Sequence, residues 1–416
     1  MAKTETSQYV ILASDEAMAL WREGKEAWNA WVEENPNANV DFSSQEFGSS
    51  SDHNGEAGHV NFSGYHFPNG RINFSGATFH AGHITFMRAK FGQSEINFDQ
   101  AQFGNGQIIF NDVDFGKSII RCFETAFGEG ILSFSNANFE KARVLFYATA
   151  FHKTKVGFMN CTFGEAIRFY ELTGLEEVPT FSFHGSSFEK LFTFSHTGKM
   201  GCPLDLRRTK ISHNVVLNDV ICEFEASPMP RWAVLASRYW SGMPAGSEPV
   251  WRWACNAKEK EDSQRFRRLK ELALNNRNHA KALEFHVQEI RTRRGHETNW
   301  VQNAGQTLYW ALGDYGRSVF RPFSWLLALW SSFGYLFYNW RDVEATSFST
   351  ALSYSGSHIL SFIPIGRTAR LQGEELLFGK DMPTPDWAIG LGAIEAILAV
   401  ILLFLLGLGL RNMFRV

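Results

Sequence analysis

The stretch that decides the fold is residues 62–115, which read FSGYHFPNGRINFSGATFHAGHITFMRAKFGQSEINFDQAQFGNGQIIFNDVDF. Phenylalanine recurs in it at spacings that alternate between five and seven residues, which makes a period of 12. No α-helix has this period, whereas short strands joined by tight corners can repeat in this way. The positions that we assign to a ladder of rings are Phe74, Phe79, Phe86, Phe91, Phe98, Phe103, Phe110 and Phe115.

The same spacing continues as far as Phe163, with Cys122 in the one missing place, and the pattern fades near Glu223. Small residues precede several of the phenylalanines by two positions, as Ala77 and Ala101 do. A small inward side chain beside a large one lets successive coils stack. The sequence therefore predicts a β-solenoid over residues 41–226, filled along its axis by phenylalanine rings.

Units such as ATFHA (77–81), AKFGQ (89–93), AQFGN (101–105) and ANFEK (137–141) resemble the pentapeptide repeat family. That resemblance implies a right-handed β-helix of four faces, with one pentapeptide on each face. Every second face here has seven residues, so that a coil of either 12 or 24 residues remains open.

The segment before the repeat is similar to the tryptophan-rich helix that precedes it in many members of that family. We expect one helix after an N-cap at Ser14, with Trp21, Trp28 and Trp31 on one face. A helix of this kind, within residues 1–40, would close the open end of the solenoid.

Composition narrows the functional classes. The net charge is −3, and residues 41–200 hold 16 acidic and 12 basic side chains, so we expect no nucleic-acid partner and no mimicry of DNA. The five cysteines form no C-x-x-C motif, and no metal site or cofactor is expected. No nucleophile–base pair or phosphate-binding loop is recognisable, so we expect that the protein is not an enzyme.

Two segments follow the repeat. Residues 227–256, rich in proline, glycine and tryptophan, are predicted to be a linker. Residues 257–297 carry 11 basic and 7 acidic side chains and predict a helical hairpin that breaks at Asn275–Asn278. It resembles the tetratricopeptide-like hairpins found near membrane segments, and we place it with an interfacial lead-in over residues 257–316. It either lies against anionic lipid or is a solvated charged surface.

The C-terminal domain, residues 317–416, contains two apolar segments, at about 322–340 and 387–410. We predict that both span a membrane. The flanking anchors would be Arg317, Arg321, Trp325, Trp340, Arg411 and Arg415. The arginines at the outer flanks place both termini in the cytoplasm of a bacterial inner membrane. The first 18 residues contain no long apolar run, so no secretory signal is expected.

Between the spans, residues 346–366 (TSFSTALSYSGSHILSFIPIG) are uncharged and rich in serine and threonine. A helix, a polar turn and an exit between two spans resemble the order in two-transmembrane tetrameric channels. The potassium filter motif is absent, so potassium selectivity does not follow. The candidate pore residues are Ser357, His358, Ser361, Phe362, Ile363, Pro364, Gly366 and Glu395.

Glu395 lies in the second span, where a carboxyl group is costly. In a homo-oligomer such as a tetramer it would form an acidic ring that favours cations, and the alternative is a structural carboxyl between helices. The leading hypothesis is an oligomeric ion channel with the solenoid as its cytoplasmic assembly or sensing domain. The alternatives are a membrane-tethered scaffold without a pore, and a membrane-disrupting effector of bacterial defence or stress.

Overall fold

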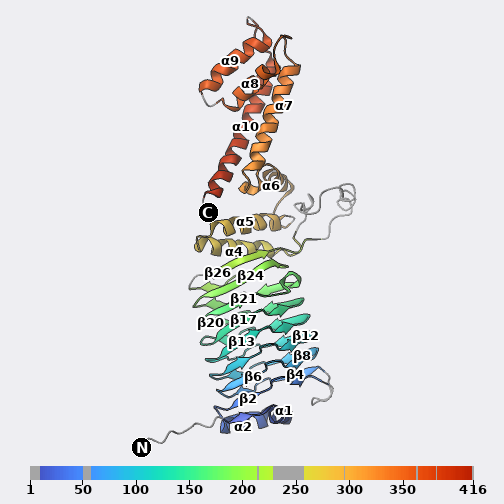
Figure 1. Cartoon of the computed structure of the whole chain (residues 1–416), viewed down its shortest axis with the longest axis vertical. Helices are drawn as coiled ribbons and strands as arrows, with labels where there is room; N and C mark the ends of the chain where they lie inside the picture. The colour runs from blue at the N-terminus through green and yellow to red at the C-terminus, as the bar shows by residue number, and fades with distance from the viewer. Residues whose placement is uncertain are drawn as a thin grey trace, which may run out of the picture. The chain divides into compact units, whose positions relative to one another are not determined.

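The computed structural model describes residues 10–49, 58–212, 215–227, 257–294, 296–361, 364–380 and 382–414 (Figure 1). The chain divides into two compact units. The first comprises Met1–Arg277 and Arg291–His296, and the second comprises Asn278–Ile290 and Glu297–Val416. Apart from Ser227, the predicted linker lies outside the described residues.

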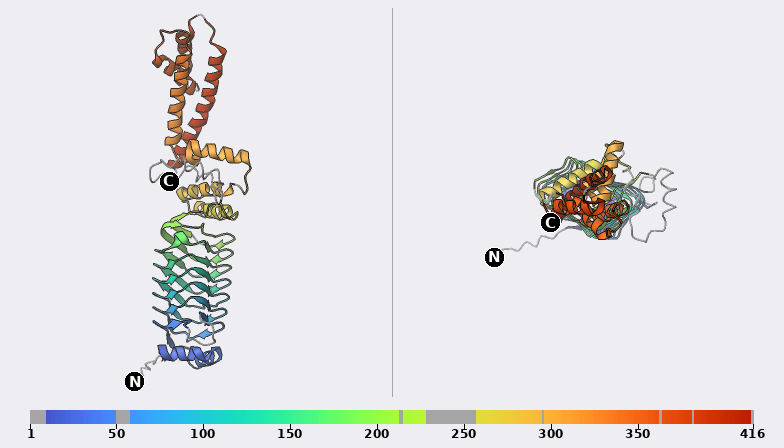
Figure 2. Two further views of the ribbon diagram at one scale, coloured as in Figure 1. Left: turned by 90° about the vertical axis from the view of Figure 1, so that its right-hand side faces the viewer. Right: turned by 90° about the horizontal axis from the view of Figure 1, so that it is seen from above.

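The first unit is a stack of coils made of short parallel strands. Equivalent residues of neighbouring coils pair 24 positions apart, as Glu95 does with Arg71 on one side and with Ile119 on the other. Two 12-residue units therefore make one coil, which settles the coil length that the sequence left open. Figure 2 shows the strands of successive coils lying edge to edge.

The strands of successive coils align on four faces. The first face contains β1 (Ile11–Leu12), β2 (Asn39–Asp41), β6 (Arg71–Asn73), β10 (Glu95–Asn97), β13 (Ile119–Phe123), β17 (Arg143–Tyr147), β21 (Ile167–Tyr170), β24 (Phe192–Met200) and β26 (Val215–Cys222). The second contains β3 (Glu46–Phe47), β7 (Thr78–Phe79), β11 (Gln102–Phe103), β14 (Ala126–Phe127) and β18 (Ala150–Phe151).

The third face contains β4 (His59–Asn61), β8 (Gly82–Thr85), β12 (Gly106–Ile109), β15 (Gly130–Ser133), β19 (Thr154–Gly157) and β22 (Thr180–Ser182). The fourth contains β5 (His66–Phe67), β9 (Lys90–Phe91), β16 (Asn138–Phe139), β20 (Thr162–Phe163), β23 (Ser187–Phe188) and β25 (Lys210–Ile211). Single bridges through Asp114 join β9 to β16 on this face. The short helix η1 (Leu175–Glu177) interrupts a late coil.

The eight ladder phenylalanines stack in four columns, one for each face. The ring centroids of Phe79 and Phe103 are 4.5 Å apart with an interplanar angle of 4°. Phe86 and Phe110 are 4.6 Å apart, Phe74 and Phe98 are 5.0 Å apart, and Phe91 and Phe115 are 5.4 Å apart. All eight side chains are buried, so the rings form the core of the solenoid.

Left-handed backbone marks one corner of every 12-residue unit. The second residue after the ladder position, which is a phenylalanine everywhere except at Cys122, takes a φ between 48° and 72° at Gly64, Gly76, Arg88, Gln100, Asp112, Glu124, Asn136, Ala148 and Asn160. Most of these residues are not glycine, although the conformation disfavours a β-carbon. The ladder contacts and the strand pairing on both sides of each corner therefore hold the backbone there.

The N-terminal segment forms two helices, and the prediction of one continuous helix is wrong. Helix α1 (Ser14–Glu23) and helix α2 (Lys25–Glu34) are separated by Gly24, whose φ of 104° ends the first helix. The N-cap position belongs to Ala13 and not to Ser14. Trp28 is fully buried and stacks on Phe42 of the first coil, so these helices do cover the end of the core.

Seven α-helices follow in the rest of the described chain. They are α4 (Asp262–Asn275), α5 (His279–Arg293), α6 (Trp300–Gly313), α7 (Phe320–Asn339), α8 (Phe348–Ile359), α9 (Pro364–Phe378) and α10 (Asp386–Met413), with the short η3 (Asp314–Gly316) before α7. The break between α4 and α5 lies at residues 276–278, close to the predicted place. Helix α4 belongs to the first unit, where the side chain of Arg268 donates to the Thr209 carbonyl oxygen of the last coils.

Within the part of the chain that is described, one helix is long and apolar enough to cross a membrane by length and composition. It is α10, with a mean hydropathy of 2.7 in its most apolar window. The other predicted span forms α7, which has 20 residues but does not meet the same criterion.

Candidate functional site

The second unit is built around a short helix packed against two longer ones. Helices α7 and α10 run side by side, and α8 packs against both (Figure 1). The side chain of Ser347 caps the start of α8 by accepting a hydrogen bond from the Thr350 amide. Helix α8 ends at Ile359 with Leu360 as its C-cap, and α9, which begins at Pro364, packs on α8. The segment predicted to be a re-entrant loop thus forms α8 and the beginning of α9.

Ser355 and Glu395 link α8 to α10. The Glu395 side chain is completely buried, and the Ser355 hydroxyl donates to its Oε1. The Trp330 carbonyl oxygen of α7 is a second acceptor for this hydroxyl, at 3.1 Å. A hydroxyl has one hydrogen. The Ser355 hydroxyl can therefore donate to only one of the two acceptors at a time. If the Glu395 carboxyl is protonated, it can donate to the Ser355 oxygen while the Ser355 hydroxyl donates to the Trp330 carbonyl oxygen. One polar junction therefore joins the three helices.

His358 lies one helical turn beyond Ser355 and packs on α10 at Gly392. The His358 ring is 5% exposed and lies between the rings of Phe337 and Tyr354. Among the described residues, neither His358 Nε2 nor Glu395 Oε2 has a hydrogen-bond partner. Buried polar atoms without partners are costly and are often associated with function. We call Ser355, His358, Gly392 and Glu395 the α8–α10 polar seam.

The other predicted pore residues are dispersed. Ser357 is buried, but its hydroxyl donates to the Tyr354 carbonyl oxygen in its own helix. Ser361, which follows α8, and Pro364, the first residue of α9, are exposed, while Gly366 is buried. Phe362 and Ile363 lie outside the described residues. Of the predicted pore residues that the structure describes, His358 and Glu395 therefore belong to the seam, and Ser355 was not foreseen.

Basic and aromatic flanks occupy opposite ends of the α7–α10 pair. Asn412 near the end of α10 donates to the Gly316 carbonyl oxygen just before α7, so Arg411, Arg317 and Arg321 share one end. At the other end, the rings of Trp340 and Trp387 are 5.4 Å apart.

Two of these flanking residues have defined contacts. Arg317 forms an ion pair with Asp314 at 3.0 Å, and Trp325 donates to the Ala311 carbonyl oxygen. The remaining predicted anchor, Arg415, lies outside the described residues.

The surface of this helix pair that faces away from its interior is apolar. Large exposed side chains on α7 and α10 include Phe323, Trp325, Leu327, Tyr335, Ile389, Ile394, Ile397, Val400 and Phe404. A soluble domain rarely exposes a continuous apolar surface of this kind.

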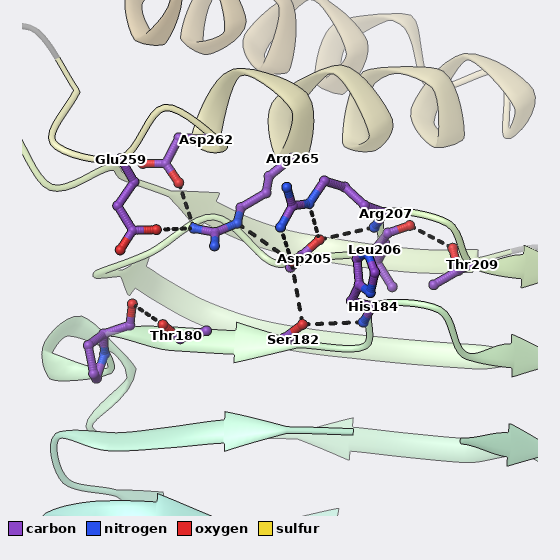
Figure 3. A network of polar contacts seen from close by, with 11 residues as sticks. Thr180, Ser182, His184, Asp205, Leu206, Arg207, Thr209, Glu259, Asp262 and Arg265 are labelled. Atoms are coloured by element: carbon purple, nitrogen blue, oxygen red, sulfur yellow. Dashed lines mark hydrogen bonds and ion pairs between the residues drawn. The ribbon is translucent and has the colours of Figure 1, made fainter. Parts of the chain in front are cut away.

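A second polar cluster lies in the first unit, where α4 covers the last coils. The guanidinium groups of Arg265 and Arg207 approach Asp205 from two sides (Figure 3). Arg265 also contacts Asp262 at 2.7 Å and Glu259 at 3.0 Å. Sequence analysis missed this cluster, because the helical pattern of α4 contains no signal that tells a buried arginine from a solvated one.

The carboxyl groups of this cluster titrate differently. Burial raises the pKa of Asp262 to about 6, although the neighbouring Arg265 opposes the shift. Burial also acts to raise the pKa of Asp205, but hydrogen bonds from Arg207 prevail and lower it below its ordinary value. Because Asp205 and the two arginines join a coil to α4, the cluster fixes how the solenoid ends.

The described residues contain no group of three or more histidine, cysteine or acidic side chains placed to hold a metal ion. No protein-family model matches the chain, and no curated protein sequence matches it either.

Proposed function

We propose that the second unit is embedded in a bilayer as one subunit of a homo-oligomeric ion-conducting pore. The solenoid, which we take to be a right-handed pentapeptide-like helix, would serve as its cytoplasmic assembly or sensing domain. The observation that carries the proposal is the short helix α8, which packs against both α7 and α10 and ends in a turn. In channels that have a pore loop, a short helix between two membrane-spanning helices supports the loop.

The surface chemistry of α7 and α10 supports a bilayer position. Their outward side chains are apolar, and α10, at 28 residues, is about 42 Å long. Arg317, Arg321 and Arg411 at one end suit a cytoplasmic interface, and the Trp340–Trp387 pair suits the outer interface, where Arg341 also lies. The proposal therefore includes α7 as a second span, with lipid and neighbouring subunits covering the apolar surface.

The polar seam has a positioning role in this proposal. Glu395 is completely buried inside one chain, so it holds α8 in place through Ser355 and does not face a central axis. The turn after α8, with Ser361 exposed, would line the conduction path instead. The C-terminal end of a helix carries partial negative charge, which favours a cation at this turn.

Conductance of the purified full chain in planar bilayers tests the proposal. We expect a steady current, which a charged thiol reagent blocks in Ser361→Cys but leaves unchanged in the wild type and in Ser349→Cys. Ser349 is also exposed, but it lies in the first turn of α8, away from the proposed path. The absence of current in every lipid would refute the pore, and so would a monomeric mass in detergent.

A membrane-tethered scaffold is the second candidate. It is favoured by the burial of His358 and Glu395 within a single chain, since these groups then need no pore to satisfy them. This candidate predicts stable membrane insertion of the full chain and no current with any variant.

A further inference from the structure

A pocket with strong positive charge lies in the first unit beside the Asp205 cluster. Its volume is about 380 Å³, and it is open to solvent. His184, Arg207 and Arg208 of the late coils form one wall. Gln264, Arg267, Arg268 and Glu271 of α4 form the other.

Four guanidinium groups face one carboxylate in this lining. Arg207 is held by Asp205, with contacts of 2.9 and 2.8 Å from its Nε and Nη2 (Figure 3). Arg268 contacts Glu271 at 3.2 Å and the Thr209 carbonyl oxygen at 2.9 Å, while its buried Nε has no acceptor in the described chain. Two of the four cations are therefore preorganised by their neighbours.

Arg208 has no counter-charge among the described residues. It is exposed, and it forms no ion pair with any described residue. Its φ of 55° places it at a left-handed corner between two ordered segments of the solenoid. A guanidinium at such a corner is presented to solvent from a fixed backbone.

We propose that this pocket binds a free small-molecule phosphate ester or diphosphate. Guanidinium groups match phosphate oxygens in a bidentate fork, and several around one pocket select for multiple negative charge. The volume is within the range of small-molecule sites. Among the described residues, His184 is the one aromatic side chain in the lining and the other lining residues are charged or amide groups, so we expect recognition to rest mainly on the phosphate groups.

Binding at this place has a structural consequence that is independent of any pore. The ligand would contact the late coils and α4 together, so its binding energy would add to the attachment of α4. A bound anion would therefore stabilise the end of the solenoid against unfolding, independently of the function of the second unit.

Calorimetric titration of the full chain in neutral detergent at low ionic strength tests the site, with pyrophosphate as the probe. We expect saturable binding at one site per chain, weakened about tenfold or more by Arg208→Gln, because a charged hydrogen bond is lost. Arg71→Gln is the matched control, because Arg71 is an exposed arginine on β6, far from the pocket in sequence and absent from its lining.

A second arm separates free phosphates from lipid headgroups. Dihexanoyl phosphatidate and dihexanoyl phosphatidylcholine are titrated below their micelle concentrations. Pyrophosphate binding that Arg208→Gln weakens and Arg71→Gln leaves intact supports the proposal. Binding of phosphatidate without pyrophosphate overturns the free-ligand proposal in favour of a lipid, and equal loss in both variants, or no saturable binding, overturns the site.

Discussion

The His358 ring lies directly against Gly392, with no room for a β-carbon between them. Gly392 and Glu395 are one turn apart on α10, and His358 and Ser355 are one turn apart on α8. The glycine contact and the Ser355–Glu395 hydrogen bond therefore fix the two helices at successive turns.

Gly392→Ala should loosen α8 from α10. A β-carbon would force the His358 ring to move, and overpacking of this kind costs about 1–3 kcal/mol. Thermal unfolding in detergent should show a lower midpoint, and any conductance should fall with it. Gly390→Ala is the control, because a β-carbon at Gly390 meets nothing within 4 Å. Equal effects of both substitutions would contradict this account of the seam.

Cys122→Phe should stabilise the solenoid. Cys122 stands between Phe98 and Phe146 in one column of rings, and it lines an internal cavity whose other walls are phenylalanine, isoleucine and valine. Filling an apolar cavity commonly adds about 0.5–2 kcal/mol. The thermal midpoint of the β-sheet circular dichroism signal should therefore rise.

Cys161→Phe provides the opposite control for that experiment. Cys161 occupies a place for small residues, two positions before Phe163, and its thiol donates to the Phe134 carbonyl oxygen at 2.7 Å. A phenyl ring there should lower the midpoint. If both substitutions destabilise equally, position 122 is not a vacancy in the column.

Trp28→Ala should expose the first coil. The indole stacks on Phe42 and donates to the His66 carbonyl oxygen at 2.7 Å, and removing a buried tryptophan costs about 3–5 kcal/mol. Amide exchange in β2 should accelerate, and self-association should increase in sedimentation. Trp31→Ala, which truncates a half-buried indole on the same helix, should have a much smaller effect.

Because the pKa of Asp262 is raised, the solenoid should be more stable in mild acid than at neutral pH. Its pKa is about 6 when folded and near 4 when unfolded, so between these values the folded chain holds a proton that unfolding releases. The free energy of unfolding should therefore fall by about 2 kcal/mol as pH rises from about 4 to about 6, and this contribution should stay constant above that.

Asp262→Asn should reduce the loss of stability between about pH 4 and about pH 6. The measurement is the thermal midpoint of the solenoid as a function of pH. Glu259 contacts the same Arg265 through a half-exposed carboxylate and helps to raise the pKa of Asp262. Glu259→Gln should therefore move the sloping region to lower pH without removing it. An unaltered slope in Asp262→Asn would place the titration elsewhere.

The parts of the fold that repeat could be predicted, whereas the parts that depend on single contacts could not. The spacing from Phe74 to Phe115 predicts stacked rings, because every coil repeats the same geometry. Gly24 splits the first helix, and Arg265 enters a buried cluster. Each of these two features depends on a single local contact, and a single contact produces no periodic pattern in the sequence.

The candidate site likewise contains one residue that the sequence singles out and another that only packing selects. Glu395 stands out as a carboxyl group in an apolar helix, so it could be singled out from the sequence. Its partner Ser355 could not, since α8 contains several serines and only packing selects one of them.

The 24-residue register gives the solenoid a unit of length. Single-residue departures are tolerated at corners, because Val144 pairs with Ile167 after 23 positions and Lys155 pairs with Thr180 after 25. Losing 12 residues would instead carry each later strand to the opposite face and turn everything beyond it by half a coil. The strand region of a chain of this design can therefore be lengthened or shortened only by whole coils. Each coil adds about 4.8 Å along the axis of the solenoid.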